Sequence, residues 1–118
     1  MAQDFERAVA SDSAGDVDIG TTARTIITSN SDDAVIGIRL SNITTATIKA
    51  DVYITSTASG GSADSYIVKG APIAAGGSLE LIDGGAKIVL LSGDALKAKS
   101  DTDASLNVWV SFIDSIST

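Results

Sequence analysis

The chain has 118 residues, 44% of them hydrophobic, and is therefore long enough for one domain with its own core. It contains no Cys and no His, which excludes disulfides, thiolate metal sites and catalysis by Ser-His-Asp or Cys-His groups. The net charge is −7 and the 8 Lys and Arg residues are scattered, so the chain lacks the basic stripe that binds nucleic acid.

Residues 1–16 are predicted to form an N-terminal arm, ahead of a single domain that spans residues 17–118. A short helix over residues 2–10 is compatible with the composition of the arm. Two interpretations remain open, a frayed tail and an arm that docks on a neighbouring subunit. Phe5 and Val9 favour the second, because large apolar side chains are unusual in a fully solvated tail.

The sequence predicts neither secretion nor membrane insertion. The opening segment carries Asp4, Glu6 and Arg7 where a secretory signal needs an apolar stretch. The longest strongly apolar run, at residues 88–91, is far too short to span a membrane. We therefore expect the protein to be made and folded in a cytoplasm and to have no membrane partner.

Beyond the arm, short apolar or alternating runs are separated by turn-forming residues, which is typical of strands rather than helices. The predicted strands lie within residues 17–29, 34–43, 47–57, 65–69, 79–82, 87–91, 95–99 and 105–113. About eight short strands without a long helix predict an all-β fold, an antiparallel β-sandwich of the jelly-roll kind. The core should be aliphatic, because aromatic residues make up only 4% of the chain.

Alternation along each strand predicts which side chains are buried. The residues expected to point inward are Ile36, Ile38 and Leu40 in the second strand, Ile48, Ala50, Val52 and Ile54 in the third, Leu79 and Leu81 in the fifth, and Leu96 and Ala98 in the seventh. In the first strand, Thr25 and Ile27 should share a face. Tyr53 should point outward. Pro72 has no N–H to donate and cannot lie in a central strand.

The last strand has an unusual outer face. Its inward residues are expected to be Leu106, Val108, Val110 and Phe112, with Asn107, Trp109, Ser111 and Ile113 on the other side. An outward Trp is either covered within the chain, for example by the arm, or lies at a subunit contact, where Trp is often a strong contributor. The candidate interface residues are therefore Phe5, Val9, Tyr53, Trp109 and Ile113.

The polar residues predict no catalytic, cofactor or metal site, and we expect no enzymatic activity. The only Glu residues are Glu6 and Glu80, and most Asp residues fall in turn-like segments, where Asp bonds locally. The Asp clusters at residues 12–18 and 101–103 lack the spacing of an EF-hand. Residues 42–44 match an N-glycosylation acceptor, which we interpret as a chance match in a chain without a secretory signal.

Several blocks of the sequence carry a resemblance to a known family. They are the opening MAQDFERAVA, then AVIGIRLSNIT and IKADVYI, and finally KGAPIAAGGSLELIDGGAKIVLLSGDALKAKS at residues 69–100. Together they resemble small virion structural proteins of tailed bacteriophages, particularly phages of marine cyanobacteria. The resemblance implies a β-rich component of the virion, assembled in the host cytoplasm and present in many symmetric copies. Its partners would be copies of itself and other virion proteins such as major capsid or tail proteins.

Three functions remain open. A capsid decoration or cement protein fits the size, the acidic composition and the lack of enzymatic groups. A neck, tail or fibre component fits the N-terminal arm about as well. The alternative from another class is a carbohydrate-binding β-sandwich used for host attachment, because sugar sites present aromatic rings with polar neighbours. Trp109, Tyr53 and Tyr66 are the few rings that could form such a site.

Overall fold

The structure is a computed structural model that describes residues 4–10, 19–56, 63–82 and 87–114. These residues form strands, turns and irregular segments, and none of them belongs to a helix that could cross a membrane. The strands are β1 (Asp4–Ala10), β2 (Arg24–Thr28), β3 (Asp33–Asn42), β4 (Ile48–Ser56), β5 (Ala63–Ile73), β6 (Ser78–Glu80), β7 (Ile88–Leu90), β8 (Ala95–Ser100) and β9 (Leu106–Asp114).

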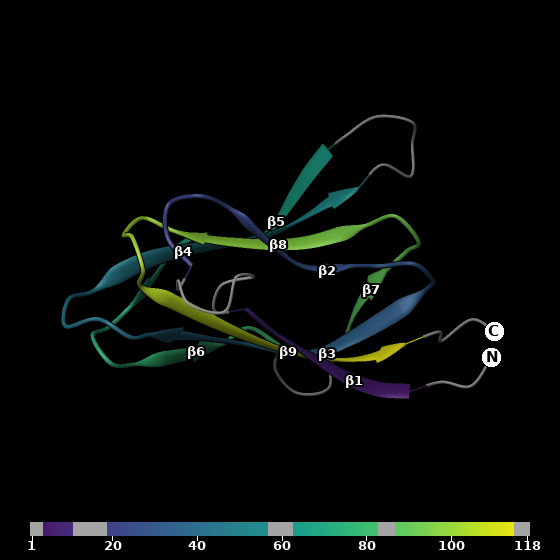
Figure 1. Cartoon of the computed structure of the whole chain (residues 1–118), viewed down its shortest axis with the longest axis horizontal. Coiled ribbons are helices and arrows are strands. Elements are labelled where there is room, and N and C mark those ends of the chain that lie inside the picture. The colour runs from purple at the N-terminus through teal and green to yellow at the C-terminus, as the bar shows by residue number, and fades with distance from the viewer. Residues whose placement is uncertain (1–3, 11–18, 57–62, 83–86, 115–118) are drawn as a thin grey trace.

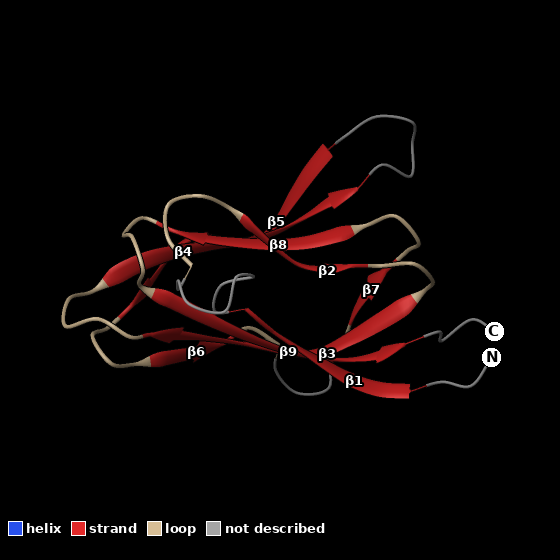
Figure 2. Cartoon of the chain, in the orientation of Figure 1, coloured by secondary structure: helices blue, strands red, loops and turns tan. Residues whose placement is uncertain are grey.

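The strands form two antiparallel sheets that pack face to face (Figure 1). The five-stranded sheet has the order β1-β9-β3-β6, and β7 pairs with β3 on the same side as β6. The four-stranded sheet has the order β2-β8-β4-β5. Figure 2 shows the strands joined by turns and irregular segments, with no helix in the described part of the chain. The predicted antiparallel β-sandwich is confirmed.

The strand pairing is nested, which identifies the sandwich as a jelly roll. β1 pairs with β9, β2 with β8, β3 with both β6 and β7, and β4 with β5. A chain folded once into a long hairpin pairs in this order, and rolling the hairpin up adds the pairs β3·β9 and β4·β8. As a consequence, β1 and β9 lie side by side although they come from opposite ends of the chain.

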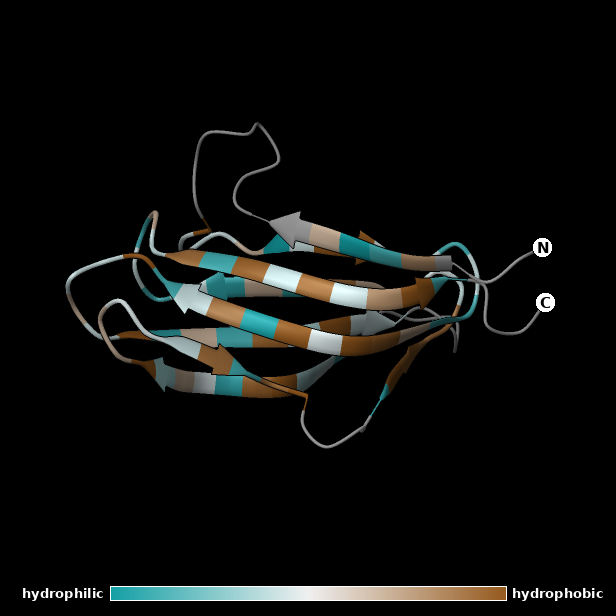
Figure 3. Cartoon of the chain, turned by 90° about the horizontal axis from the view of Figure 1, so that it is seen from below, coloured by the Kyte–Doolittle hydropathy of each residue, from teal (hydrophilic) through white to brown (hydrophobic). Residues whose placement is uncertain are grey.

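The core between the sheets is almost entirely aliphatic. Its largest fully buried hydrophobic side chains are Ile19, Ile38, Leu40, Ile48, Leu90, Leu96, Leu106, Val35, Val52, Val108 and Val110. Figure 3, seen from below, shows hydrophobic residues alternating with more polar ones along the strands. The alternation predicted for the last strand is confirmed, because Val108, Val110 and Phe112 in β9 are buried. Each such side chain stabilises the fold by about 1.5–3 kcal/mol relative to leaving it in water.

Two β-bulges reverse the alternation that we predicted. The pairing of β3 with β9 shifts register between Val35 and Gly37, so Val35 is fully buried while Ile36 is only partly buried. In β2 the register shifts between Thr25 and Ile27, and Ile27 is buried while Thr25 is exposed. The predictions that Ile36 shares the core face and that Thr25 shares a face with Ile27 were wrong, because one inserted residue turns the following side chains to the other face.

The position of Pro72 agrees with its missing N–H. Pro72 lies in β5, an edge strand of the four-stranded sheet, and pairs with Lys49 in β4. β5 is longer than the strand predicted at residues 65–69, because the chain continues through a bulge. At this bulge Gly70 has a φ of 67°, and its N–H donates to Oδ1 of Asp51 at 2.7 Å.

Residues 4–10 of the predicted arm form β1 at the edge of the five-stranded sheet. The short helix that we considered for residues 2–10 is therefore wrong. A helix of that length is marginal by itself, whereas pairing with β9 over seven positions satisfies backbone groups along the whole segment. The other parts of the predicted arm, residues 1–3 and 11–16, lie outside the described residues.

Candidate functional site

The register of β1 against β9 brings together four of the five predicted interface positions. Phe5 pairs with Ile113, and Val9 pairs with Trp109. Residues directly opposite each other in antiparallel strands share a face of the sheet. The residues that alternate with Trp109 and Ile113 in β9 point into the core. Phe5, Trp109 and Ile113 therefore lie on the outer face of the five-stranded sheet.

An apolar row crosses this outer face at one end. Ala34 in β3 pairs with Ile113 on one side and with Val89 in β7 on the other. Phe5, Ile113, Ala34 and Val89 thus lie in line over four strands, and we name them the apolar row. Phe5 is 79% exposed and Val89 is 52% exposed, whereas Ala34 is buried without belonging to the core cluster. Ala34 and Val89 were not predicted from the sequence, because their alignment depends on which strands are neighbours.

Trp109 lies on the same face, further along β9, and is 45% exposed. The guanidinium carbon of Arg7 lies 4.9 Å from the centroid of the Trp109 ring, which is a cation–π contact. Because β1 runs beside β9 in the sheet, Arg7 reaches the ring while the indole keeps access to solvent. Of the open interpretations of Trp109, complete burial within the chain is contradicted by this exposure.

Tyr53 lies in the other sheet and does not join this surface. Tyr53 is 8% exposed, and its ring packs against Tyr66, with the two ring centroids 4.9 Å apart. Nζ of Lys69 lies 4.3 Å from the centroid of Tyr66. Burial, reinforced by the negative charge of Asp64, raises the pKa of the Tyr53 hydroxyl above its ordinary value. Tyr53 does not belong to the core cluster, so it faces outward as predicted, but Tyr66 is among the neighbours that cover it.

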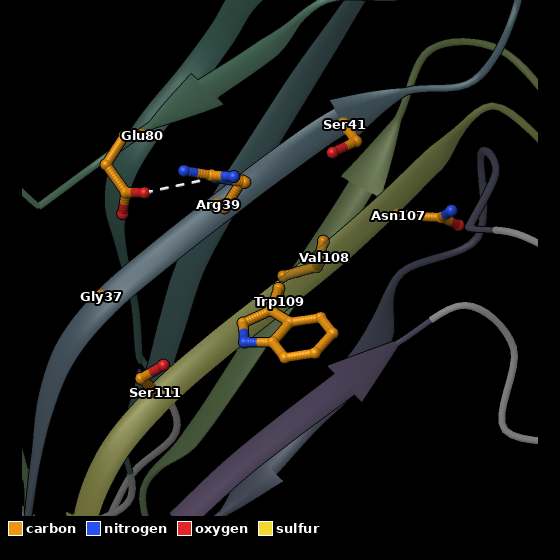
Figure 4. A pocket seen from close by; sticks show the side chains of 8 residues that line it. All are labelled: Gly37, Arg39, Ser41, Glu80, Asn107, Val108, Trp109 and Ser111. Atoms are coloured by element: carbon orange, nitrogen blue, oxygen red, sulfur yellow. Dashed lines mark ion pairs between the residues drawn. The ribbon is translucent and has the colours of Figure 1, made fainter.

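Beside Trp109 the outer face is hollowed across the neighbouring strands β9, β3 and β6 (Figure 4). This hollow has a volume of about 640 Å³. Its lining residues are Gly37, Arg39, Ser41, Glu80, Asn107, Val108, Trp109 and Ser111. The polar ones were predicted to point away from the core. Their meeting was not predicted, because alternation along a strand does not say which strands are neighbours.

An ion pair forms one wall of the hollow. Nε of Arg39 lies 3.5 Å from Oε1 of Glu80, and both side chains are partly exposed. Oε2 of Glu80 also accepts the backbone N–H of Ile38 at 3.1 Å, which holds the carboxylate against β3. A Cβ at Gly37 would lie 3.8 Å from Oε2 of Glu80 and 3.9 Å from Cβ of Ser111. The missing side chain at Gly37 therefore leaves this part of the hollow open.

Asn42, the residue of the glycosylation match, has a structural role. It is 2% exposed, and its Nδ2 donates to the carbonyls of Ala46 at 2.8 Å and Ile73 at 2.9 Å. Its Oδ1 accepts the backbone N–H of Thr44 at 2.9 Å. The amide nitrogen that a glycan would need is thus buried and bonded inside the protein.

A second polar cluster ties the turn between β2 and β3 to the end of β9. Asp33 is 2% exposed and accepts hydrogen bonds from the hydroxyls of Ser29 at 2.8 Å and Ser31 at 2.9 Å. The Ser31 hydroxyl also lies 3.0 Å from Oδ1 of Asp114. Such buried polar groups stabilise one arrangement of the turn when they are satisfied.

The described acidic residues of the 101–103 cluster bond to segments that are distant in the sequence. Oδ1 of Asp101 accepts the backbone N–H of Lys49 at 3.1 Å, and this bond holds the pKa of Asp101 below its ordinary value. Oδ1 of Asp103 accepts the hydroxyl of Thr21 at 3.0 Å. Across residues 4–10, 19–56, 63–82 and 87–114, no three or more His, Cys, Asp or Glu residues gather where they could hold a metal ion. The cluster at residues 12–18 lies outside this part of the chain.

Comparisons with known proteins give no relative. No protein-family model, no curated protein and no solved structure matches the chain. The fold and the site define a jelly-roll β-sandwich whose five-stranded sheet exposes an apolar row, a Trp and a polar hollow on one face.

Proposed function

We propose that the chain is a structural protein of a bacteriophage particle, a capsid decoration or cement protein that stabilises the shell through repeated protein–protein contacts. The contacts are made by the outer face of the five-stranded sheet, centred on the apolar row and Trp109. The chain acts without catalysis, by holding neighbouring subunits together.

The observation that carries the proposal is the exposure of Phe5, which pairs with Ile113, and of Trp109 further along the same face. Large apolar side chains gathered on one face of a folded domain mark an interaction surface far more often than single scattered ones do. Trp and Arg are enriched among the residues that dominate binding energy, and here Arg7 already holds the ring of Trp109.

Fold and resemblance add indirect support. Jelly rolls occur in viral capsid proteins and in lectins, although a fold by itself does not determine a function. The resemblance of the sequence blocks points to the virion among these uses. In a particle with many symmetric copies, each contact can be modest, because linked contacts bind at high effective concentration.

A neck, tail or fibre position is the alternative within the same class. The same face would then contact a different virion protein, and nothing in the residues of the face separates the two positions. Immunogold labelling of intact particles distinguishes them directly, since label on the head supports decoration and label on the neck or tail supports the alternative.

The proposal is tested by replacing Trp109 with Ala and measuring how much of the variant enters particles. We expect particle incorporation to fall, with the isolated chain still folded. Ile43→Ala is the matched control, because Ile43 is also 45% exposed but lies just beyond β3, at the end away from Ala34. Absence of the protein from mature particles, or turnover of a small molecule by the purified chain, would refute the proposal.

A further inference from the structure

The hollow beside Trp109 differs in chemistry from the apolar row. The row presents hydrocarbon to a partner, whereas the hollow is lined by one aromatic ring and a set of polar side chains (Figure 4). Its volume of about 640 Å³ lies within the range of roughly 300–1,000 Å³ that is common for small-molecule sites. This part of the face therefore fits a small ligand better than a flat protein contact.

The charge of the hollow is balanced. Arg39 and Glu80 are the charged residues of the lining, and they neutralise each other at 3.5 Å. Oε2 of Glu80 also accepts the N–H of Ile38, so both carboxylate oxygens already have partners. A phosphate or a nucleic acid would meet a carboxylate at the same wall as the guanidinium. The lining therefore disfavours the binding of both anions and cations, and it suits a neutral polar ligand.

Donors and acceptors lie around the aromatic ring. Ser41 and Ser111 supply hydroxyls, and Asn107 supplies an amide, all on the outer face and all in the lining. Trp109, which is 45% exposed, offers an apolar surface, and Arg7 contacts its ring. A ligand that suits this set has C–H groups on one face and hydroxyl groups around its rim.

We infer that the hollow binds a neutral hexopyranose unit of a glycan. The C–H face of the sugar ring lies against Trp109, and its hydroxyls bond to the polar lining. The site shares Trp109 with the proposed protein contact, but its other residues lie in β3, β6 and the middle of β9 and not in the apolar row.

The chain contains a single Trp, so its fluorescence reports directly on the hollow. The purified chain is titrated with the methyl glycosides of glucose, galactose, mannose and N-acetylglucosamine, and with inorganic phosphate as the charged probe. We expect a saturable change with at least one glycoside and none with phosphate. Saturation with phosphate alone, or no saturation with any of the glycosides, overturns the inference.

A blocked hollow provides the sharper test. Gly37 ends the bulge in β3 but has no positive φ, and a Cβ there meets nothing closer than 3.8 Å. Gly37→Leu should therefore keep the fold and fill the hollow. Thr25→Leu, which adds the same side chain at an exposed position of β2 in the other sheet, is the matched control. We expect glycoside affinity to fall about tenfold or more in the first variant and to stay unchanged in the second.

Asn107→Ala serves as a second variant if Gly37→Leu fails to fold, and it should also weaken glycoside binding. Glycoside binding that survives in a folded Gly37→Leu chain overturns the inference, and so does binding that survives Asn107→Ala. The two proposals fail separately, because Phe5→Ala should reduce assembly and leave glycoside affinity intact. Gly37→Leu should weaken glycoside binding by the dispersed chain, where no protein contact is made.

Discussion

Replacing Phe5 by Ala should weaken assembly while leaving the isolated chain almost as stable. Burying a Phe side chain completely is worth about 1.5–3 kcal/mol. Because Phe5 is 79% exposed, most of this free energy is not used in the free chain. About 1–2.5 kcal/mol is therefore available to each contact with a partner, and about 0.5 kcal/mol or less to the fold.

These free energies give separate expectations for two measurements. A loss of 1.4 kcal/mol corresponds to a tenfold change in affinity, so the dissociation constant of each contact should rise about fivefold to sixtyfold. Sedimentation of the wild-type and variant chains over a range of concentrations measures this change. Urea unfolding measures the stability of the fold, where we expect a change of about 0.5 kcal/mol or less.

Ile43→Ala is again the control, because it removes an exposed apolar side chain outside the apolar row. It should leave both association and stability close to wild type. The reasoning is refuted if the Phe5→Ala chain associates and enters particles as the wild type does. It is also refuted if the variant loses stability by several kcal/mol, since Phe5 would then be a residue of the fold and not of the contact.

Three further predictions concern the fold itself. Asn42→Ala should lower the free energy of unfolding in urea by about 2–4 kcal/mol, because it leaves buried carbonyls and an N–H without partners, and a loss below about 1 kcal/mol would contradict this. Asp33→Ala should lower the free energy of unfolding by about 1–3 kcal/mol, because it leaves the hydroxyls of Ser29 and Ser31 without their acceptor. An unchanged urea midpoint would contradict a stabilising role of these hydrogen bonds. Burial raises the pKa of Tyr53, so the folded chain keeps its proton longer than the unfolded chain. The stability that depends on this proton is complete below a pH of about 10 and is lost as the pH rises through the pKa of the folded state. In a Tyr66→Phe chain, where Tyr53 is the one tyrosine left, ultraviolet absorbance should show ionisation above a pH of about 10, and a midpoint at or below it would be inconsistent with burial.

The strands were predictable because their signal is local. In β9, the buried residues Val108, Val110 and Phe112 alternate with polar or exposed ones, and nothing interrupts the period of two. Pro72 was placed correctly away from a central strand from its missing N–H alone. Such features depend on residues that are close in the sequence, so one sequence is enough to predict them.

The failures have a common cause in contacts between distant segments. A short helix was considered for residues 2–10, but residues 4–10 form β1 because they pair with β9. Ile36 was predicted to lie in the core, but the pairing of β3 with β9 contains a bulge there. These features depend on a partner strand that is remote in the sequence. Local periodicity therefore gave the wrong structure for the first and the wrong face for the second.

The candidate site was predictable only in its parts. Trp109 and Ile113 were placed on the outer face, and Phe5 was suspected of making a contact, each from its own segment. Nested pairing puts these segments side by side, and the order β9-β3-β6 brings Arg39 and Glu80 to the same hollow. The composition of the site therefore follows from the topology, which the sequence pattern did not determine.

The apolar row and the hollow are close enough to compete for partners. Ile113 in the row and Trp109 at the hollow are four residues apart on β9, or about 13 Å at the rise of a strand. A standard protein interface covers about 800 Å² on each partner and so extends about 15 Å from its centre. A contact of this size centred on the row would cover the hollow as well. We therefore expect glycoside binding, followed through Trp109, to weaken about tenfold when the chain is assembled. Equal affinity in assembled and dispersed protein would show that the contact is smaller than this or lies elsewhere, and would contradict a standard interface centred on the row.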